Sequence, residues 1–348
     1  MLPQLRAKRL AIALTALVLF ICCVTIGRKL YNFANLFGLF KPHSGICITQ
    51  GEIAQAHANA TTPDPRKPVV SKMLHQIFHN WKDPHNDTLP DHWEAARQTC
   101  KDLNPTWEHK LWTMDNSREF LKEHFAWYLP TYDSYKFPIQ RVDVLRYFLI
   151  RHYGGIYLDL DNGCAADLTP LTYYPAFTTD GGEGALSNNI MGGAPEHPYF
   201  RLLTEHLIPW NWNWLLPYVI ISYSSGQWFV TAMWEKYHAL LNRDGSIMPF
   251  DGNDFAPLHH ILMDMREGAD PWVFFTQVHG GTWTNWDSAM FSFIGDHILL
   301  IIVGVLGLVG ASVWSCMWCM RRRSKPAKGY DVLPSAEQMS EESHFRNI

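Results

Sequence analysis

The sequence predicts an α/β domain with a mostly parallel sheet, flanked by two membrane-spanning helices. From about residue 70 onwards, short apolar segments typical of strands alternate with helical patterns, and this alternation builds parallel sheets. The pair Gly154 and Gly155 separates one helical pattern from the strand-like run that follows it, because glycine tolerates the left-handed turn that ends a helix. Two uncharged apolar runs, one near each end of the chain, are of the kind that crosses a bilayer.

The composition narrows the class of protein. The chain has 348 residues, 47% of them hydrophobic, with 15 tryptophans, which is typical of a folded protein with membrane contact and excludes a disordered chain. The net charge is −4 and no basic stretch is interleaved with aromatic residues. A nucleic-acid partner is therefore not expected.

The first apolar run extends from Leu10 to Ile26 and follows three basic residues. Its length is near the lower limit for a spanning helix. A cleaved signal peptide is the alternative, but a small-x-small cleavage site does not follow clearly. We expect a transmembrane signal anchor over residues 10–27, with residues 1–9 in the cytosol.

The second apolar run, from Ile298 to Met320, contains no charge and is followed by three arginines. It predicts a transmembrane helix over residues 297–320. Basic residues are concentrated in the tail that follows, so the positive-inside rule puts residues 321–348 in the cytosol. Both termini are then cytosolic, and the region between the two spans is luminal.

Two further features agree with a luminal middle region. Asn59 and Asn86 each begin an Asn-x-Thr sequence, so both are expected glycosylation sites. Outside the apolar segments only Cys47, Cys100 and Cys164 remain, which allows at most one disulfide among them.

We expect residues 28–69 to form a luminal stem, because its second half is rich in Ala, Thr and Pro without a clear period. The folded domain is predicted to cover residues 70–290. Its first expected elements are, in order, a strand from Val70 to Phe78, a helix from Trp93 to Leu103 that Asp91 caps, a strand from Trp107 to Trp112 and a helix from Asn116 to His124.

A helix is predicted from Pro138 to His152, with proline in its first turn. Gln140, Asp143 and Arg146 recur at three-residue intervals and share one face of it. A surface ion pair between Asp143 and Arg146 is the simpler reading. Because the helix leads directly into the next strand, its polar face is instead expected to line a cleft at the carboxyl ends of the strands, where α/β sheets bind ligands.

Asp159 and Asp161 end the buried strand predicted from Ile156 to Leu160. Residues two apart on a strand lie on one face, and two adjacent carboxylates are costly to bury without a cation. Hard divalent ions with oxygen ligands neutralise such pairs and also hold phosphate oxygens. We therefore expect a metal–diphosphate site, although a bare Asp-x-Asp also occurs in solvated loops.

Three later segments are candidates for ligand or membrane contact. Residues 208–222 are rich in tryptophan and are expected to lie at a membrane interface, with a packed core helix as the alternative. The Gly-centred turn before Trp228 offers backbone N–H groups to an anion. His279 precedes two glycines and is a possible metal or phosphate ligand.

Four motifs together resemble the DXD-containing fungal mannosyltransferases of glycosyltransferase family 32. They are His75-Gln76-x-Phe78, Pro138-Ile139-Gln140-Arg141-x-Asp143-x-x-Arg146-Tyr147, Gly154-Gly155-Ile156-Tyr157-x-Asp159-x-Asp161 and Gly281-Thr282-Trp283. Within that family the chain is most similar to members that act on a sphingolipid. The resemblance covers the chain from about Val70 to the end of the second apolar run.

The resemblance implies a GT-A (Rossmann-like) fold and a retaining transfer of mannose from GDP-mannose, with Mn²⁺ or Mg²⁺ as cofactor. It assigns catalytic roles to Asp143, Arg146, Asp159 and Asp161, and metal binding to Asp159 and Asp161, with Asp161 binding the metal directly. Donor contacts are expected from Phe78, Gln140, Asp143, Arg146, Asp159, Thr282 and Trp283. The chain departs from the family pattern at Asn162, where an acidic residue is frequent, and at Gln227, where Gly226 is usually followed by proline.

The expected acceptor is inositol phosphorylceramide in the Golgi membrane, and the acceptor side is assigned to Asn188, Asn189 and Trp228. The resemblance also implies a regulatory membrane subunit as partner. Three alternatives stay open: an α-mannosyltransferase that acts on protein N-glycans or other glycans, a non-catalytic regulatory membrane subunit, and a metal-dependent phosphohydrolase.

Overall fold

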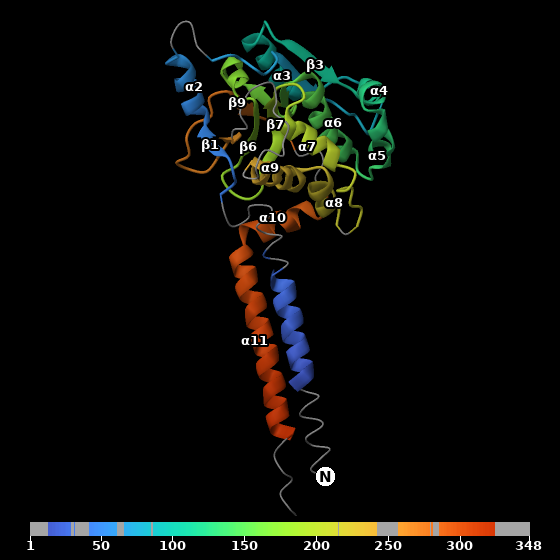
Figure 1. Cartoon of the computed structure of the whole chain (residues 1–348), viewed down its shortest axis with the longest axis vertical. Coiled ribbons are helices and arrows are strands. Elements are labelled where there is room, and N and C mark those ends of the chain that lie inside the picture. Colours follow the sequence, from blue (N-terminus) through green and yellow to red (C-terminus); the bar gives the residue numbers. More distant parts are fainter. Residues whose placement is uncertain are drawn as a thin grey trace, which may run out of the picture. The chain divides into compact units, whose positions relative to one another are not determined.

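The computed structural model describes residues 13–28, 31, 42–60, 66–84, 86–214, 216–241, 257–278, 280 and 285–323 (Figure 1). The chain divides into two compact units, Met1–Asn285 and Trp286–Ile348. The first unit contains the α/β domain and the second contains the long apolar helix.

Seven strands of the described residues form one sheet in the order β1-β8-β6-β7-β4-β2-β3. The α/β class is confirmed, but the sheet is mixed, because β7 runs antiparallel to both β4 and β6. The other neighbours in the sheet are parallel. The strands are β1 (Ile46–Thr49), β2 (Met73–Ile77), β3 (Glu108–Trp112), β4 (Gly155–Leu158), β6 (Ala176–Asp180), β7 (Ser187–Gly193) and β8 (His259–Leu262).

Helices cover both faces of this sheet, and a separate two-stranded sheet pairs β5 (Asn162–Cys164) with β9 (Phe275–Gln277). Along β4, Tyr157 joins one hydrophobic core with residues of α6, whereas Ile156 and Leu158 join a second core on the other face. The helices are α2 (Gln50–Ala58), α3 (Asp91–Leu103), α4 (Met114–His124), α5 (Leu129–Ser134), α6 (Pro138–Tyr153), α7 (Pro198–His206), α8 (Pro217–Ser224) and α9 (Gln227–Leu241). Two short 3₁₀ helices, Ala126–Tyr128 and Thr169–Tyr173, complete the unit.

The predicted connection from α6 to β4 is confirmed. Gly154 and Gly155 adopt φ angles of 67° and 96°, which L side chains rarely accept. A Cβ on Gly155 would lie 2.5 Å from the Met73 carbonyl oxygen, so glycine is also required for β4 to approach β2. The strand is shorter than predicted, however. It ends at Leu158, and the Asn162 N–H donates to the Asp159 carbonyl at 3.0 Å.

Asp159 and Asp161 therefore lie in a turn and not on one face of a strand, as the alternation had suggested. The turn carries the chain from the large sheet into β5, which belongs to the small one. A period-two pattern cannot reveal such a change of sheet.

The folded domain begins earlier than the predicted boundary at residue 70. β1 pairs in parallel with β8, and α2 begins with a capping box in which the Thr49 side chain and Glu52 satisfy each other's backbone N–H groups. Ile53 is buried in the same core as Val70. The stem prediction for residues 28–69 fails over this part, because the partner of β1 lies more than 200 residues away in the sequence. Residues 29–30, 32–41 and 61–65 lie outside the described part.

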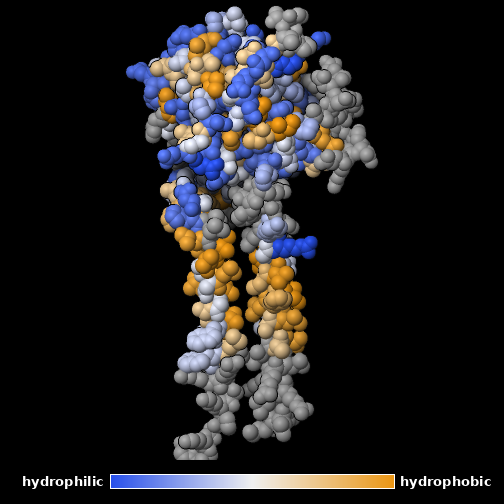
Figure 2. Space-filling model, turned by 90° about the vertical axis from the view of Figure 1, so that its left-hand side faces the viewer, coloured by the Kyte–Doolittle hydropathy of each residue, from blue (hydrophilic) through white to orange (hydrophobic). Residues whose placement is uncertain are grey.

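In the second unit, α10 (Ser288–Asp296) precedes α11 (Ile298–Arg323). Within the described residues, one helix, α11, is long and apolar enough to cross a membrane. None of its 19-residue segment Leu300–Trp318 is buried, and its surface is hydrophobic (Figure 2). This agrees with the predicted span over residues 297–320. The helix Ala13–Arg28 is apolar but shorter than a spanning helix requires, and residues 10–12 lie outside the described part, so two spans are not confirmed.

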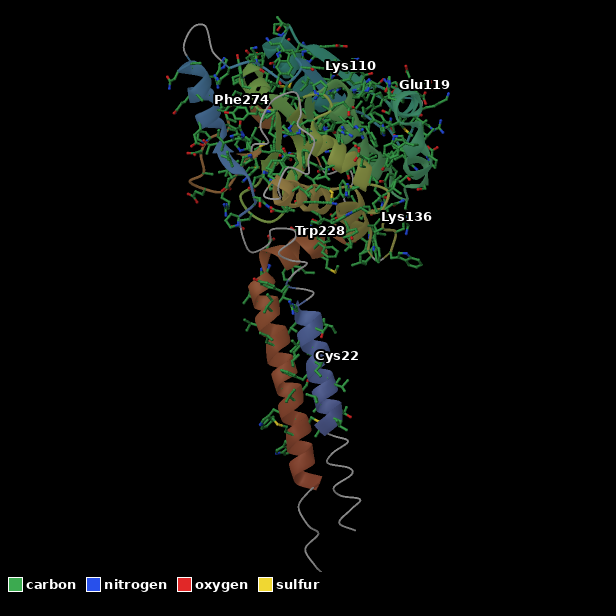
Figure 3. The ribbon with its side chains drawn as sticks, in the orientation of Figure 1. Cys22, Lys110, Glu119, Lys136, Trp228 and Phe274 are labelled. Atoms are coloured by element: carbon green, nitrogen blue, oxygen red, sulfur yellow. A yellow bond between two sulfur atoms is a disulfide. The ribbon has the colours of Figure 1, made fainter. Side chains whose placement is uncertain are left out.

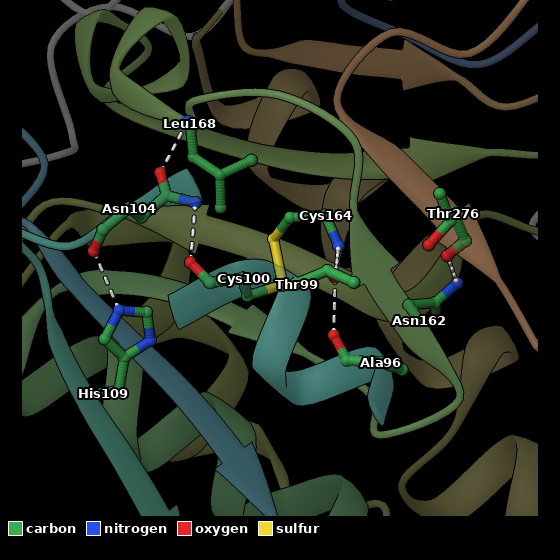
Figure 4. The surroundings of a disulfide bond; sticks show 9 residues. All are labelled: Ala96, Thr99, Cys100, Asn104, His109, Asn162, Cys164, Leu168 and Thr276. Carbon is green, nitrogen blue, oxygen red and sulfur yellow. Dashed lines mark hydrogen bonds between the residues drawn. A yellow bond between two sulfur atoms is a disulfide. The ribbon is translucent and has the colours of Figure 1, made fainter. Parts of the chain in front are cut away.

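A disulfide joins Cys100 in α3 to Cys164 in β5 (Figure 4). The adjacent Thr99 hydroxyl accepts a hydrogen bond from the Cys164 N–H at 2.9 Å and donates one to the Ala96 carbonyl at 2.7 Å. The bridge is the single one that the three cysteines allowed, and it leaves Cys47 as a free thiol. It fixes β5, and thereby the turn with the two aspartates, to α3.

We expect the double variant Cys100→Ser/Cys164→Ser to lose about 2–5 kcal/mol of unfolding free energy, because the bridge closes a loop between residues 64 apart in the sequence. Thermal unfolding of the full-length protein measures this loss. Cys316→Ser, which changes an exposed free cysteine of α11, is the control. An unchanged melting temperature in the double variant would contradict the bridge.

Candidate functional site

A cavity of about 550 Å³ opens where β2 and β4 end. Phe78 follows β2 and Asp159 follows β4, so the carboxyl ends of two neighbouring parallel strands meet at this cavity, as predicted for an α/β sheet. Other walls come from α6, from β7 and from the turn between α8 and α9. The polar wall residues include His79, Asn80, Asp143, Arg146, Asp159, Asp161, Ser187, Asn188, Asn189, Ser222 and Gln227.

Arg146 of α6 is the centre of the polar wall. Its side chain is only 3% exposed, and its guanidinium nitrogens lie 3.1 Å from an Asp143 oxygen and 3.3 Å from an Asp159 oxygen. It also donates to the Asn188 carbonyl at 2.5 Å and lies 4.5 Å from the centre of the Tyr157 ring. Burial alone lowers the pKa of Arg146, but the neighbouring acids, Asp159 first, raise it above its ordinary value. The arginine is therefore a permanently charged cation beside the cavity, paired with two carboxylates through its terminal nitrogens, while its buried Nε has no hydrogen-bond partner within the described residues.

Asp143 is held by side chains from two elements outside its own helix. One carboxylate oxygen accepts from the Asn188 amide of β7 at 3.0 Å, and the other accepts from the Ser225 hydroxyl at 3.0 Å. Tyr147 completes this network by donating to the Ser225 carbonyl and accepting from Asn188. Burial raises the pKa of Asp143 to about 6, against the lowering effect of Arg146.

The two aspartates of the turn differ in their surroundings. Asp159 pairs with Arg146, accepts a short hydrogen bond from the Tyr157 hydroxyl, and donates its own N–H to the Asn189 carbonyl at 2.9 Å. Within the described part of the chain, Asp161 forms no ion pair with a basic side chain. Burial, followed by repulsion from Asp159, raises the pKa of Asp161 to about 6. Of the two carboxylates, Asp161 is the one whose charge lacks compensation.

These residues fit a divalent metal ion. Carboxylate oxygens are the ligands that Mg²⁺ and Mn²⁺ prefer, and an added cation would remove the repulsion that raises the Asp161 pKa. The segment after β9 passes close to Asp161. The Val278 N–H donates to the Asp161 backbone carbonyl at 2.8 Å, and a Cβ on Gly280 would lie 1.8 Å from the carboxylate oxygen Asp161 Oδ2. Only glycine leaves that carboxylate room at this position.

The predicted donor residues divide into three groups. Phe78 lines the cavity, with its ring edge-to-face against Trp93 at 6.2 Å between centroids. Gln140 is fully buried and its side-chain oxygen accepts from the Phe137 N–H at 3.1 Å, so it caps α6 and is not a cavity-lining residue. The predicted donor contacts Thr282 and Trp283 lie outside the described residues, as does the predicted metal ligand His279.

The predicted acceptor residues also divide. Asn188 and Asn189 both line the cavity. Trp228, labelled in Figure 3, instead lies on α9 with its ring edge-to-face against Tyr218 at 5.9 Å, and it packs against the main core. It is not among the cavity-lining residues.

Several residues that line the cavity or support its wall have no individual signal in the sequence. His79 is buried, which lowers its pKa to about 4, and its Nε2 lies 3.0 Å from the Ser117 hydroxyl. Trp93 lies on α3 and lines the cavity, but its sequence pattern indicates only a helix. Ser225 belongs to the turn that was expected to bind an anion through its backbone, but its hydroxyl holds Asp143 instead. Such tertiary contacts have no local sequence signal.

Comparison with known proteins gives a consistent result. Residues 90–178 match the family model for the glycosyltransferase sugar-binding region containing a DXD motif. Mannosyl phosphorylinositol ceramide synthase SUR1 of Saccharomyces cerevisiae is 31% identical over 82% of this chain and 72% of its own length. Inositol phosphoceramide mannosyltransferase 2 of Schizosaccharomyces pombe is 35% identical over 68% of this chain and 65% of its own. Mannosyl phosphorylinositol ceramide synthase CSH1 of Saccharomyces cerevisiae is 33% identical over 70% and 61%, respectively.

The matched region contains α6, β4 and the aspartate turn, which together define a glycosyltransferase with a DXD motif. The chain belongs to the DXD-containing glycosyltransferase family that includes the three yeast proteins, and the resemblance drawn from its motifs is confirmed. Among solved structures, the PaToxG glycosyltransferase aligns with 55% of this chain and 77% of its own at 14% identity, with a TM-score of 0.35. That likeness is too low to assign the fold in more detail.

The raised pKa of Asp161 predicts that ionisation of this acid lowers the unfolding free energy of the metal-free protein, a cost that depends on pH. Folding raises the pKa from 3.8 to about 6, so the cost appears as the pH rises above about 4 and is complete above about 6. With a chelator present, Asp161→Asn should melt at a higher temperature than the wild type at pH 7.5 and at the same temperature near pH 4.

The control for this comparison is Asp270→Asn, which changes an exposed aspartate and should leave both melting temperatures unaltered. Equal melting temperatures of Asp161→Asn and wild type at pH 7.5 would show that the charge of Asp161 does not destabilise the folded protein.

Proposed function

We propose that this protein is a retaining mannosyltransferase with a GT-A fold that transfers mannose from GDP-mannose to the inositol of inositol phosphorylceramide. The observation that carries the proposal is the set of Asp143, Arg146, Asp159 and Asp161 on the wall of one cavity, in a chain 31–35% identical to yeast enzymes named for this activity. The chain spans 61–72% of the length of those three relatives.

In this proposal, Asp161 binds Mn²⁺ or Mg²⁺ directly, and Asp159 contacts the metal through water or contacts the donor ribose. The cation would supply Lewis-acid stabilisation of the negative charge that develops on the leaving diphosphate. Its affinity depends on pH, because Asp161 must be ionised to bind a cation.

Arg146 and Asp143 are proposed to orient the donor. The guanidinium is fixed by two carboxylates and a carbonyl before any ligand arrives, so little reorganisation is needed when a phosphate or sugar oxygen approaches it. Asp143 is anchored by Ser225 and Asn188. Because Asn188 of β7 is also a predicted acceptor residue, its hydrogen bond to Asp143 links the donor side of the cavity to the acceptor side.

The nucleobase is proposed to bind in the aromatic part of the cavity. Phe78 and Trp93 both line it, and their perpendicular rings form a corner into which a flat base can pack. Phe78 follows β2 directly, while the aspartates follow β4, which pairs with β2. The base and the diphosphate of one donor can thus contact neighbouring strand ends.

We assign the α/β domain to the Golgi lumen and both termini to the cytosol. The Cys100–Cys164 bridge supports an oxidising compartment, and the expected glycosylation sites Asn59 and Asn86 are both exposed. The apolar helix α11 supports membrane association. The basic residues after it favour a cytosolic tail.

We further propose that residues 208–222 contact the bilayer surface. Trp210 is stacked on Tyr223 at 4.6 Å and belongs to the core side of this segment, whereas Trp212 and Trp214 are 43% and 73% exposed. Exposed tryptophans are favoured where headgroups meet acyl chains. Because α8 continues from this segment into the cavity wall at Ser222, a lipid headgroup held by these tryptophans would lie close to the site.

A regulatory membrane subunit is proposed from the family resemblance. Gly304, Gly307 and Gly310 recur at three-residue intervals on α11, and a Cβ on any of them would meet nothing within 4 Å. Small residues in this arrangement allow close approach of another helix. The surface they form is compatible with such a partner.

The metal role predicts that Asp161→Ala lowers mannose transfer by at least about a hundredfold, because the charge on the leaving diphosphate is no longer balanced. The measurement is transfer from radiolabelled GDP-mannose in purified membranes, with inositol phosphorylceramide and free oligomannose as competing acceptors. Asp270→Ala is the control, and expression and glycosylation of the Asp161 variant should match the wild type.

Full activity of Asp161→Ala would refute the metal role. Labelled oligomannose in place of labelled lipid would identify a glycan mannosyltransferase. Absence of any labelled product from the wild type would favour a non-catalytic subunit.

The membrane-contact proposal predicts a difference between acceptors. Trp212→Ser/Trp214→Ser should lower transfer to inositol phosphorylceramide in bilayers by roughly tenfold, which corresponds to about 1.4 kcal/mol. Transfer to water-soluble glycerophosphoinositol should stay unchanged. Trp127→Ser, which alters a tryptophan that is 49% exposed on a short 3₁₀ helix, is the control. Equal losses with both acceptors would indicate damage to the cavity instead.

A further inference from the structure

Three potential metal ligands meet outside the cavity, on neighbouring strands at the other end of the sheet order. Cys47 lies on β1, Asp180 on β6 and His260 on β8. One donor atom from each lies within 4.8 Å of the others. The residues are far apart in the sequence, and no local motif links them.

The register of the sheet explains why they face each other. Cys47 is paired with His260, and His260 is paired on its other side with Thr178. Asp180 is two residues beyond Thr178 on β6, so its side chain lies on the same face of the sheet as that of Thr178. Three adjacent parallel strands thus present a thiol, an imidazole and a carboxylate together.

The imidazole and the carboxylate are both buried, with His260 4% and Asp180 7% exposed. His260 Nδ1 lies 2.9 Å from Asp180 Oδ2, but this nitrogen makes no well-aligned hydrogen bond within the described part of the chain. The other carboxylate oxygen of Asp180 accepts from the Gly182 N–H at 2.7 Å. One nitrogen and one oxygen therefore remain available to a cation, close enough to bind the same ion.

The other titratable groups nearby are already engaged. His43, whose ring centroid is 6.1 Å from that of His260, has Nδ1 3.3 Å from Glu235 and Nε2 2.9 Å from the Gly184 carbonyl. Glu235 of α9 also accepts from the Ser44 N–H and hydroxyl. His238 contacts the Trp234 carbonyl through Nδ1 and accepts from the Leu258 N–H through Nε2. These side chains flank the three candidate ligands without competing for the same ion.

We propose that Cys47, Asp180 and His260 form a second metal site, selective for a transition metal ion such as Zn²⁺. A thiolate and an imidazole favour zinc over Mg²⁺ and Mn²⁺, whereas the aspartate pair at the cavity offers oxygen ligands alone. Cys47 is exposed, so water can supply a fourth ligand. The site is independent of the proposed transferase activity.

Such an ion would fasten the edge of the sheet. Within the described residues, β1 is a four-residue strand at the edge of the sheet with β8 as its neighbour, and its ladder to β8 connects residues 46–49 to the sheet. An ion shared by β1, β6 and β8 would cross-link three strands, and binding to the folded state alone would stabilise that state. We assign the site a structural role.

Cobalt tests the proposal directly, because thiolate ligation of Co²⁺ gives an intense near-ultraviolet charge-transfer absorption that oxygen ligands do not give. Full-length protein in detergent should show this absorption with one Co²⁺ per chain. Excess Zn²⁺ should remove it and excess Mg²⁺ should not. Cys47→Ser should abolish the absorption, whereas Cys316→Ser, which alters a free cysteine of α11, should preserve it.

A second measurement separates ligation from misfolding. Zn²⁺ should raise the melting temperature of the wild type and of Cys316→Ser, but not that of Cys47→Ser or His260→Gln. With a chelator in place of Zn²⁺, the melting temperatures of all four proteins should agree to within a few degrees. Absence of the absorption from the wild type, or its retention in Cys47→Ser, would overturn the proposal.

Discussion

The structure of the site depends on one buried cation, the guanidinium of Arg146, which lies between the carboxylates of Asp143 and Asp159. A buried arginine without such partners would be strongly destabilising, and each carboxylate would be costly to ionise without the arginine. The pairing leaves Asp161 as the acid without a basic partner in the described part of the chain, next to the backbone at Gly280. One charge remains to be balanced, and it faces the cavity in which a nucleotide diphosphate and its metal ion are proposed to bind.

The rest of the domain keeps these groups at fixed distances. α6 carries Asp143 and Arg146 and leads through Gly154 and Gly155 into β4, after which Asp159 follows. One short connection therefore links the helix with Asp143 and Arg146 to the strand that positions Asp159. The chain then leaves the large sheet, and the Cys100–Cys164 bridge anchors the strand that follows the aspartate turn. Ser225 from the α8–α9 turn and Asn188 from β7 both donate hydrogen bonds to Asp143. A disulfide, a backbone connection and side-chain hydrogen bonds thus fix the positions of the carboxylates at the cavity.

The sequence was sufficient for the elements with strong local signals. The α6 periodicity, the two glycines and the apolar run of α11 predicted their structures, and the motif residues Asp143, Arg146, Asp159 and Asp161 were all found at one cavity. Long-range contacts could not be predicted: β1 pairs with a strand more than 200 residues away. The Gln140 error is local instead: its side chain caps its own helix by accepting from the Phe137 N–H, as glutamine at the third helical position often does, although its spacing suggested a ligand contact. Asn162, singled out as a departure at the metal site, is fully buried and donates from its amide to the Thr276 carbonyl of β9 at 3.3 Å. The partners of β1 and of Asn162 are set by tertiary packing, which local periodicity does not encode.

In the proposed mechanism, the uncompensated charge of Asp161 binds a divalent cation. Equilibrium binding of Mn²⁺ to the full-length protein, followed by the electron paramagnetic resonance signal of the free ion between pH 5 and 7.5, tests it most directly. We expect one site whose affinity increases as the pH rises through about 6, the pKa of Asp161, and which is lost in Asp161→Asn. Binding that is independent of pH, or that survives this substitution, would contradict it.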